Sequence, residues 1–208
     1  MKRLNLFVFI FLTGFLFNAC KKTNSPAFEQ HTTDVENHKT DWFHDGLKAK
    51  VKSIEEKYYG AFGNLSDAQK GELSNTVLIS YDENGFQIVN KNVIVVHYNS
   101  NGLKDTITNL DNNGKMSSRF VNTYDVNNHL ARTLMYDENG NPLYTWIYEY
   151  DTADNIKEEA LYNAVGTQIN HSRYIYSFDT NGNWTKKVII NTDTEEPVQI
   201  IERTLTYY

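Results

Sequence analysis

Tyr136-Asp137-Glu138-Asn139-Gly140 is one copy of a five-residue pattern that recurs along most of this chain. A copy has an aromatic or aliphatic residue, then Asp or Asn, and in most copies Gly comes last. The other copies begin at Tyr81, Tyr98, Leu110, Tyr124, Tyr150, Tyr162 and Phe178. Asp or Asn can accept hydrogen bonds from its own backbone, and Gly adopts a positive φ without a Cβ clash. Between alternating apolar runs, the pattern predicts hairpin turns.

The copies follow a regular interval. Tyr98, Tyr124 and Tyr150 are 26 residues apart, and so are Leu110, Tyr136 and Tyr162. A period of this length indicates an array in which each repeat is one supersecondary unit, here two strands and two turns. Successive turns of an antiparallel meander lie at opposite ends of the sheet. We therefore predict an all-β fold, an antiparallel β-meander of about 11 strands.

The expected strands cover nearly all of the chain after residue 46. They are 47–59, 73–81, 86–98, 103–110, 115–124, 129–136, 142–150, 155–162, 167–178, 183–191 and 198–208. The polar loop at 60–71 has room for one helical turn. Side chains alternate between the two faces of a strand, and counting by twos from the repeat tyrosines collects apolar residues. This places the repeat tyrosines on the buried face and Glu159 on the opposite face.

A wide sheet with one apolar face must bury that face. We therefore expect the sheet to curl, or to close into a barrel-like form. This prediction makes residues 46–208 a single β-repeat domain.

The amino terminus has the pattern of an export signal. Lys2 and Arg3 precede an apolar run too short to span a bilayer. The end of this run, Phe17-Asn18-Ala19-Cys20, resembles a bacterial lipobox. The resemblance implies that residues 1–19 are a lipoprotein signal peptide and that Cys20 carries a lipid. Residues 20–45 are polar and patternless, which predicts a flexible tether.

Charge and cysteine content narrow the partners. The net charge is −6, without a basic stripe, and this argues against nucleic acid. Cys20 is the only cysteine, so no disulfide framework is possible. Nothing in the sequence suggests a cofactor, and the expected membrane association is through the lipid anchor.

Residues 174–188 resemble an RHS/YD repeat, in which Tyr-x-Tyr-Asp-x-x-Gly-Asn precedes a strand. Here the segment is Tyr174-Ile175-Tyr176-Ser177-Phe178-Asp179-Thr180-Asn181-Gly182-Asn183-Trp184 and onward. The likeness covers about residues 73–191, with degenerate copies. The chain is also similar to small Bacteroidota lipoproteins. This resemblance implies a repetitive β-sheet in the cell envelope, and carbohydrate binding has been proposed for some members of the repeat family. The family has no catalytic residues to carry over.

Two aromatic features are candidate ligand contacts. Tyr144, Trp146, Tyr148 and Tyr150 fall on one face of one expected strand. They could form a platform for sugar rings, or they could point into the core with the repeat tyrosines. Trp184 directly follows a turn, where it could lie exposed at the rim of the sheet.

Metal and catalytic signals are weak. His38, Asp41, His44 and Asp45 could be zinc ligands, but they also fit a polar tether. Asp-x-Asn-Gly begins like a calcium loop yet lacks the later bidentate carboxylate, so we expect no metal site. Nucleophile, zinc-protease and phosphate-loop motifs are absent from the sequence. We therefore expect a protein that is not an enzyme.

These features lead to one main hypothesis and one alternative. The main hypothesis is an envelope lipoprotein that acts as a binding or scaffold module for an extracytoplasmic polysaccharide or protein. The alternative is a small barrel that holds an apolar or lipidic ligand. Lys21 and Lys22 stand where surface-exported Bacteroidota lipoproteins carry acidic residues, so we expect an outer-membrane lipoprotein that faces the periplasm.

Overall fold

The computed structural model describes residues 39–88 and 94–208. One short helix, α1 (Asp41–His44), precedes 11 strands in this part of the chain. The strands are β1 (Val51–Phe62), β2 (Gln69–Ser80), β3 (Ile94–Tyr98), β4 (Lys104–Leu110), β5 (Met116–Tyr124), β6 (Leu130–Tyr136), β7 (Pro142–Tyr150), β8 (Ile156–Asn163), β9 (Gln168–Phe178), β10 (Trp184–Asn191) and β11 (Glu196–Tyr207). The expected signal peptide, Cys20 and most of the expected tether lie outside the described residues.

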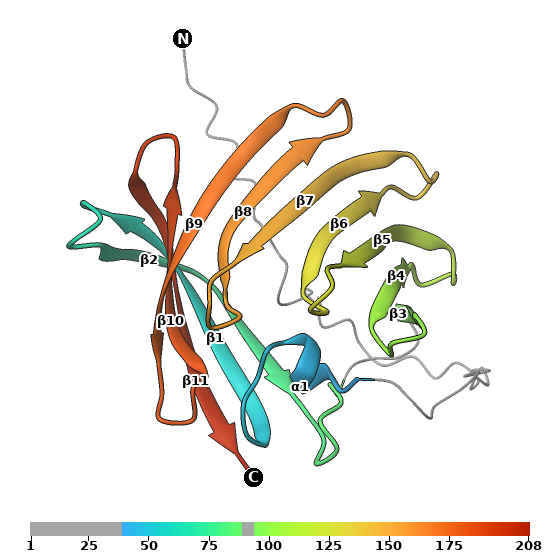
Figure 1. Ribbon diagram of the computed structural model, residues 1–208, viewed down its shortest axis with the longest axis horizontal. Coiled ribbons are helices and arrows are strands. Elements are labelled where there is room, and N and C mark those ends of the chain that lie inside the picture. The colour runs from blue at the N-terminus through green and yellow to red at the C-terminus, as the bar shows by residue number, and fades with distance from the viewer. Residues whose placement is uncertain (1–38, 89–93) are drawn as a thin grey trace.

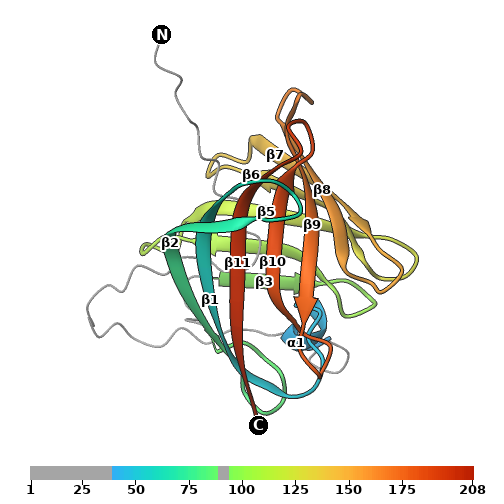
Figure 2. The ribbon, with the colours of Figure 1, turned by 90° about the vertical axis from the view of Figure 1, so that its left-hand side faces the viewer.

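The strands form one antiparallel sheet, as the repeat predicted. Its order is β2-β1-β11-β10-β9-β8-β7-β6-β5-β4-β3. Neighbours in this order are mostly neighbours in sequence, which is the meander, but β1 also pairs with β11. The sheet is strongly twisted, and β3 and β5 run across the direction of β1, β10 and β11 (Figures 1 and 2). It is not closed, because β2 and β3 are its two edges and do not pair, so the barrel-like closed form is wrong.

The described parts of the expected strand 86–98 contact different edges of the sheet. Its first part runs along β2, because Gln87 forms an isolated bridge with Tyr81 and the Ile88 N–H donates to the Ser80 carbonyl at 2.8 Å. Its last part is β3, which pairs with β4 at the other edge. The two described parts of this segment therefore lie at opposite edges of the sheet, and residues 89–93 between them lie outside the described residues.

The repeated motif forms the predicted hairpin turn. In the copy at Asp137, the Gly140 N–H donates to the Asp137 carbonyl at 3.1 Å, and the Asn139 and Asn141 N–H groups donate to Asp137 Oδ1 at 2.9 and 2.8 Å. The same bonds recur in the other copies. The last residue of the five-residue motif, three positions after the Asp or Asn, has a positive φ in every copy, including Asn128 at 66° and Asp154 at 64°. This is why Gly is preferred at that position but is not obligatory.

The predicted buried face does not hold for all of the repeat tyrosines. Every hairpin between β3 and β10 has a register shift beside its turn. Such a bulge adds a residue, which reverses the parity of the buried face in the next strand. Tyr150 therefore packs in the apolar face with Trp146, whereas Tyr136 lies on the other face beneath the Arg119 guanidinium. For the same reason Glu159 is buried, not exposed.

A ladder of hydrogen bonds follows the 26-residue repeat. Tyr124 and Tyr150 begin copies of the motif, and Tyr176 lies one repeat further along, two residues before Phe178. The hydroxyls of Tyr124, Tyr150 and Tyr176 donate to the carbonyls of Lys104, Leu130 and Ile156, at 2.8, 3.1 and 2.9 Å. Donors and acceptors are each spaced by one repeat. Each hydroxyl thus links two turns at the same end of the sheet and satisfies a backbone carbonyl next to a bulge.

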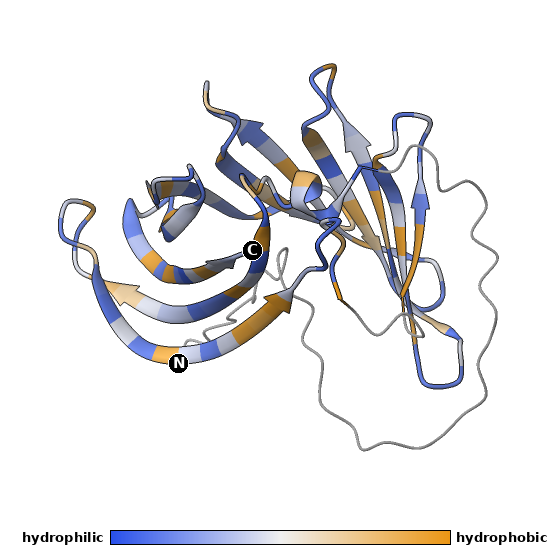
Figure 3. Cartoon of the chain, turned by 90° about the horizontal axis from the view of Figure 1, so that it is seen from below, coloured by the Kyte–Doolittle hydropathy of each residue, from blue (hydrophilic) through white to orange (hydrophobic). Residues whose placement is uncertain are grey.

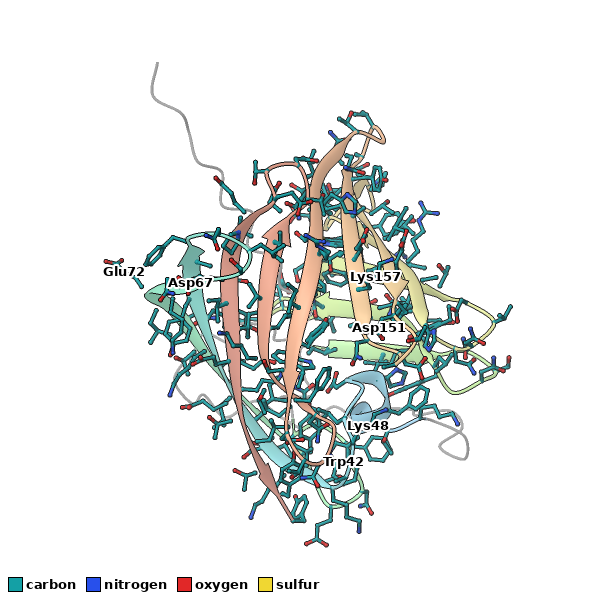
Figure 4. The ribbon with its side chains drawn as sticks, turned by 60° about the vertical axis from the view of Figure 1, so that its left-hand side comes forward. Trp42, Lys48, Asp67, Glu72, Asp151 and Lys157 are labelled. Carbon is teal, nitrogen blue, oxygen red and sulfur yellow. The ribbon has the colours of Figure 1, made fainter. Side chains whose placement is uncertain are left out.

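Residues 39–45 belong to the folded domain, although we expected them to be part of the tether. The backbone N–H of Trp42 donates to the Gly85 carbonyl at 3.1 Å, and the backbone N–H of Lys39 donates to the Gly102 carbonyl at 2.9 Å. Asp41 pairs with Lys104. Gly85 follows edge strand β2 and Gly102 follows edge strand β3, so this segment, the α1 latch (residues 39–48), joins the two edges at one end of the sheet. Figure 4 shows Trp42 of α1, and Lys48 close to this helix, at that end.

Buried residues form three clusters along one face of the sheet. The first, around Ile54 and Tyr81, includes the α1 latch through Trp42. The second surrounds Tyr58 and Tyr174, and the third surrounds Trp146 and Leu161. Apolar and polar residues alternate along the strands (Figure 3), as expected for a sheet packed on one face. The helical turn considered for 60–71 is instead a loop closed by the Asp67 N–H and the Asn64 carbonyl at 3.1 Å.

Candidate functional site

The repeat architecture creates a cavity between two neighbouring turns at the latch end of the sheet. We call it the rim cavity. It has a volume of about 500 Å³ and is lined by Asp125, Asn127, His129, Ala131, Tyr148, Glu149, Tyr150, Asp151 and Asp154. These residues come from the turns before β6 and β8 and from the adjoining parts of β6 and β7. The cavity is therefore assembled from one 26-residue repeat and the next.

His129 joins the two turns. Its Nδ1 lies 3.3 Å from Asp125 Oδ2, and its Nε2 lies 3.2 Å from Asp154 Oδ1. The imidazole also stacks on the Tyr150 ring, with 4.5 Å between centroids. These contacts fix the imidazole and the Tyr150 ring as one aromatic wall of the rim cavity.

Tyr148 contributes the least satisfied polar group of the cavity. Its side chain is only 5% exposed. Its hydroxyl lies beside the Thr133 side chain but forms no well-aligned hydrogen bond with the described residues. Thr133, a polar neighbour, donates its own hydroxyl proton to Asn122 Oδ1 at 2.9 Å. Burial raises the pKa of the Tyr148 phenol well above its ordinary value, so the hydroxyl keeps its proton. A buried hydroxyl without a well-aligned hydrogen bond costs free energy that a ligand acceptor would recover.

The carboxylates of the cavity already form some hydrogen bonds and ion pairs within the protein. Asp125 Oδ1 and Asp151 Oδ1 each accept two backbone N–H bonds of their own turns. Bonds from the backbone lower the pKa of Asp125 below its ordinary value, so it is ionised at neutral pH. Glu149 lies 3.4 Å from Lys157 Nζ. Their remaining lone pairs can accept bonds from a neutral hydroxyl-bearing ligand.

A second group of polar side chains lies on the buried face near Trp184. Arg203 pairs with Glu56 at 2.7 Å, and both side chains are buried. The Arg203 guanidinium stacks over the Trp184 ring, 3.4 Å from its centroid, and Lys187 Nζ lies 4.9 Å from the same centroid. Glu159 is also buried there, and burial raises its pKa to about 7.

The structure places the candidate residues from the sequence at two separate locations. Trp146 and Tyr148 are 7% and 5% exposed, in the packed face rather than on an open platform, and only Tyr148 lines the rim cavity. Trp184 is half-buried beneath two cations, not exposed at the rim. Cys20 lies outside the described residues.

The His/Asp group of the expected tether has structural partners instead. Asp41 contacts Lys104, and Asp45 accepts a bond from the Tyr81 hydroxyl at 2.6 Å. Burial lowers the pKa of His44 to about 4, which keeps it neutral. His38 lies outside the described residues. Within 39–88 and 94–208, no three His, Cys, Asp or Glu side chains are arranged to hold a metal ion.

The sequence interpretation missed Glu56, Lys187, Arg203 and Glu159. The sequence does contain a signal for Glu56 and Arg203, because each lies two positions from an apolar residue on either side, on the buried face of its strand. The segments are Ile54-Glu55-Glu56-Lys57-Tyr58 and Ile201-Glu202-Arg203-Thr204-Leu205. Charged residues at such positions indicate a buried polar cluster. Glu159 and Lys187 were hidden by the bulges that reverse parity.

Comparison with known proteins does not name a family. No protein-family model matches the sequence, and no curated protein matches it. Among solved structures, a porin-like protein from Bacteroides uniformis ATCC 8492 is similar at 10% identity with a TM-score of 0.42, covering 77% of this chain and 99% of that chain. A porin-like protein from Bacteroides vulgatus ATCC 8482 is similar at 11% identity with a TM-score of 0.39, covering 76% and 98%. Likeness at this level carries no conclusion about function.

The described ranges contain no helix long and apolar enough to cross a membrane.

Proposed function

We propose that this protein is a non-enzymatic envelope lipoprotein whose sheet binds a saccharide at the rim cavity. Tyr148 carries the proposal, because this residue lines the cavity and its buried hydroxyl forms no well-aligned hydrogen bond with the described part of the chain. A saccharide hydroxyl supplies an acceptor for it.

The rest of the cavity has the chemistry that saccharides require. Sugar rings combine apolar C–H faces with many hydroxyls. The His129–Tyr150 stack offers an aromatic wall, and Asn127, Asp151 and Asp154 offer planar polar groups around it. A few fixed polar groups beside aromatic rings are the usual composition of a small-molecule site.

The envelope location rests on the sequence. The lipobox-like segment ending at Cys20 and the RHS/YD-like repeats favour an outer-membrane lipoprotein that faces the periplasm. We further propose that the sheet is of YD-repeat type, supported by the 26-residue ladder of tyrosine hydroxyls. A polysaccharide of the envelope is then the natural partner, and an envelope protein is the other partner compatible with a scaffold role.

A glycan array tests the binding role. The full-length protein, purified in detergent, is incubated with neutral, amino and acidic oligosaccharides. We expect binding to a defined subset, and we expect His129→Ala to weaken it because the substitution removes half of the aromatic wall. His97→Ala is the matched control, since His97 lies on β3, outside the cavity lining. No signal for any glycan, or equal signals for the two variants, would count against the proposal.

A further inference from the structure

The buried face contains more positive charge around Trp184 than its own carboxylates neutralise. Lys187 Nζ lies 5.0 Å from the Tyr174 ring centroid and 4.9 Å from the Trp184 ring centroid. No carboxylate is within ion-pair distance of this ammonium in the described residues. Aromatic faces attract a cation, but they do not neutralise its charge.

Arg203 has an unused donor beside Lys187. Its Nε and Nη2 engage Glu56 Oε1, each at 2.7 Å. Its Nη1 is buried and has no hydrogen-bond partner among residues 39–88 and 94–208, in a side chain that is 6% exposed. Glu56 is itself committed, because its other oxygen accepts the Tyr58 hydroxyl. Glu56 thus pairs with Arg203 and leaves Lys187 without an ion-pair partner among the described residues.

The remaining carboxyl nearby is a poor counter-charge. Burial raises the pKa of Glu159 to about 7, so a large share of it is neutral at neutral pH. Its Oε1 also lacks a partner within the described part of the chain. Burial and the neighbouring Arg203 lower the pKa of Lys187 to about 8, although Glu56 and Glu159 act in the opposite direction. Removing charges from water without full pairing costs several kcal/mol per ion.

We propose that Lys187 and Arg203, lying against Trp184, form a binding site for one carboxylate or phosphate group of a ligand. The anion would lie between the ammonium and the free Nη1 of Arg203, and the rings of Trp184 and Tyr176, whose centroids are 6.0 Å apart, would contact the body that carries it. Trp184 is half-buried, and the Lys187 ammonium and the Arg203 Nη1 are buried beside it, so the two donors of the site are shielded from solvent.

The site lies on β10 and β11, three or four strands from β7, which carries Tyr148. At about 4.8 Å per strand the separation is roughly 15–20 Å. It is therefore distinct from the rim cavity, and either site can bind without the other.

Direct titration of the lysine tests this site. The full-length protein is labelled with ¹³C-lysine, and the Lys187 signal is identified by its loss in Lys187→Met. The pKa of Lys187 is then measured in chloride, acetate and phosphate at equal ionic strength. Lys186, on the opposite face of the same strand, is the internal control.

We expect acetate or phosphate to raise the pKa of Lys187 by roughly half a unit or more, since an adjacent anion favours the charged form. Lys186 should not respond. The stronger of the two anions identifies whether the natural ligand presents a carboxylate or a phosphate. Anion-induced shifts of the Trp184 indole signal should disappear in Lys187→Met and persist in Lys186→Met and Lys187→Arg. Equal responses of Lys186 and Lys187, or a Trp184 shift that survives in Lys187→Met, would overturn the proposal.

Discussion

Gly85→Ala tests the α1 latch against a matched control. A Cβ at Gly85 would lie 2.5 Å from Trp42 Cε3, and φ there is +88°. At Gly140 φ is +82°, but a Cβ would have no atom within 4 Å. Both substitutions carry the left-handed backbone penalty, about 1–2 kcal/mol. Only Gly85→Ala must also displace the indole.

The extra cost follows from what Trp42 contacts. Truncating a fully buried Trp costs about 3–5 kcal/mol, and Trp42 is half-buried, so we take roughly 2. Its Nε1 also donates to the Val51 carbonyl at 2.8 Å, which adds about 1 kcal/mol. Gly85→Ala should therefore lose roughly 2–3 kcal/mol more than Gly140→Ala.

Thermal and urea unfolding measure this difference. At about 2–4 °C per kcal/mol for a chain of this size, the Tm of Gly85→Ala should lie roughly 5–10 °C below that of Gly140→Ala. Adding Trp42→Ala to Gly85→Ala should cost little more, because the contact is already lost. Equal Tm values for the two glycine variants would refute the idea that the latch is part of the folded domain.

Three further outcomes follow from the buried charges and the anchor. The raised pKa of Glu159, from 4.5 to about 7, means that folding favours its protonated form. The contribution of Glu159 to stability should fall by roughly 3 kcal/mol as pH rises from about 4.5 to 7, at 1.36 per unit, whereas that of His44 should rise because its pKa is lowered. In urea titrations the stability of wild type relative to Glu159→Gln should therefore fall over this range. Arg203→Met should lose about 3–5 kcal/mol by leaving Glu56 buried and unpaired, and the double variant with Glu56→Met should recover most of the loss, or the ion pair is not the cause. Cys20→Ser should move the protein from the membrane to the soluble fraction, and its retention in the membrane would contradict a lipid anchor.

The number and order of hairpins could be predicted because their signals are local. Asp137 and Gly140 determine a turn through bonds within five residues, so each copy of the motif is sufficient evidence by itself. Nine of the strands, β2 to β10, follow from these turns and from the alternation between them. The pairing of β1 with β11 joins segments far apart in the chain and has no local signal.

The faces of the strands were harder to predict than the strands themselves. One bulge beside a turn shifts parity by a residue, and this moved Glu159 from the expected exposed face to the buried one. The α1 latch was missed because its polar sequence gives no apolar period. The α1 latch is held in place by contacts with Gly85 and Lys104, which only the folded sheet brings close to each other. The rim cavity likewise depends on two turns one repeat apart.

Tyr148→Phe tests the saccharide-binding proposal most directly. The substitution removes one buried hydroxyl that forms no well-aligned hydrogen bond with the described residues, so stability in urea should stay equal or increase slightly. Isothermal titration with the glycan that binds most strongly on the array should show about tenfold weaker binding, the loss expected for one hydrogen bond. Tyr162→Phe is the control, because the Tyr162 hydroxyl donates to Gln168 at the opposite end of the sheet. Weaker binding of Tyr148→Phe alone, at unchanged stability, is the predicted result, and wild-type affinity in Tyr148→Phe would contradict the account.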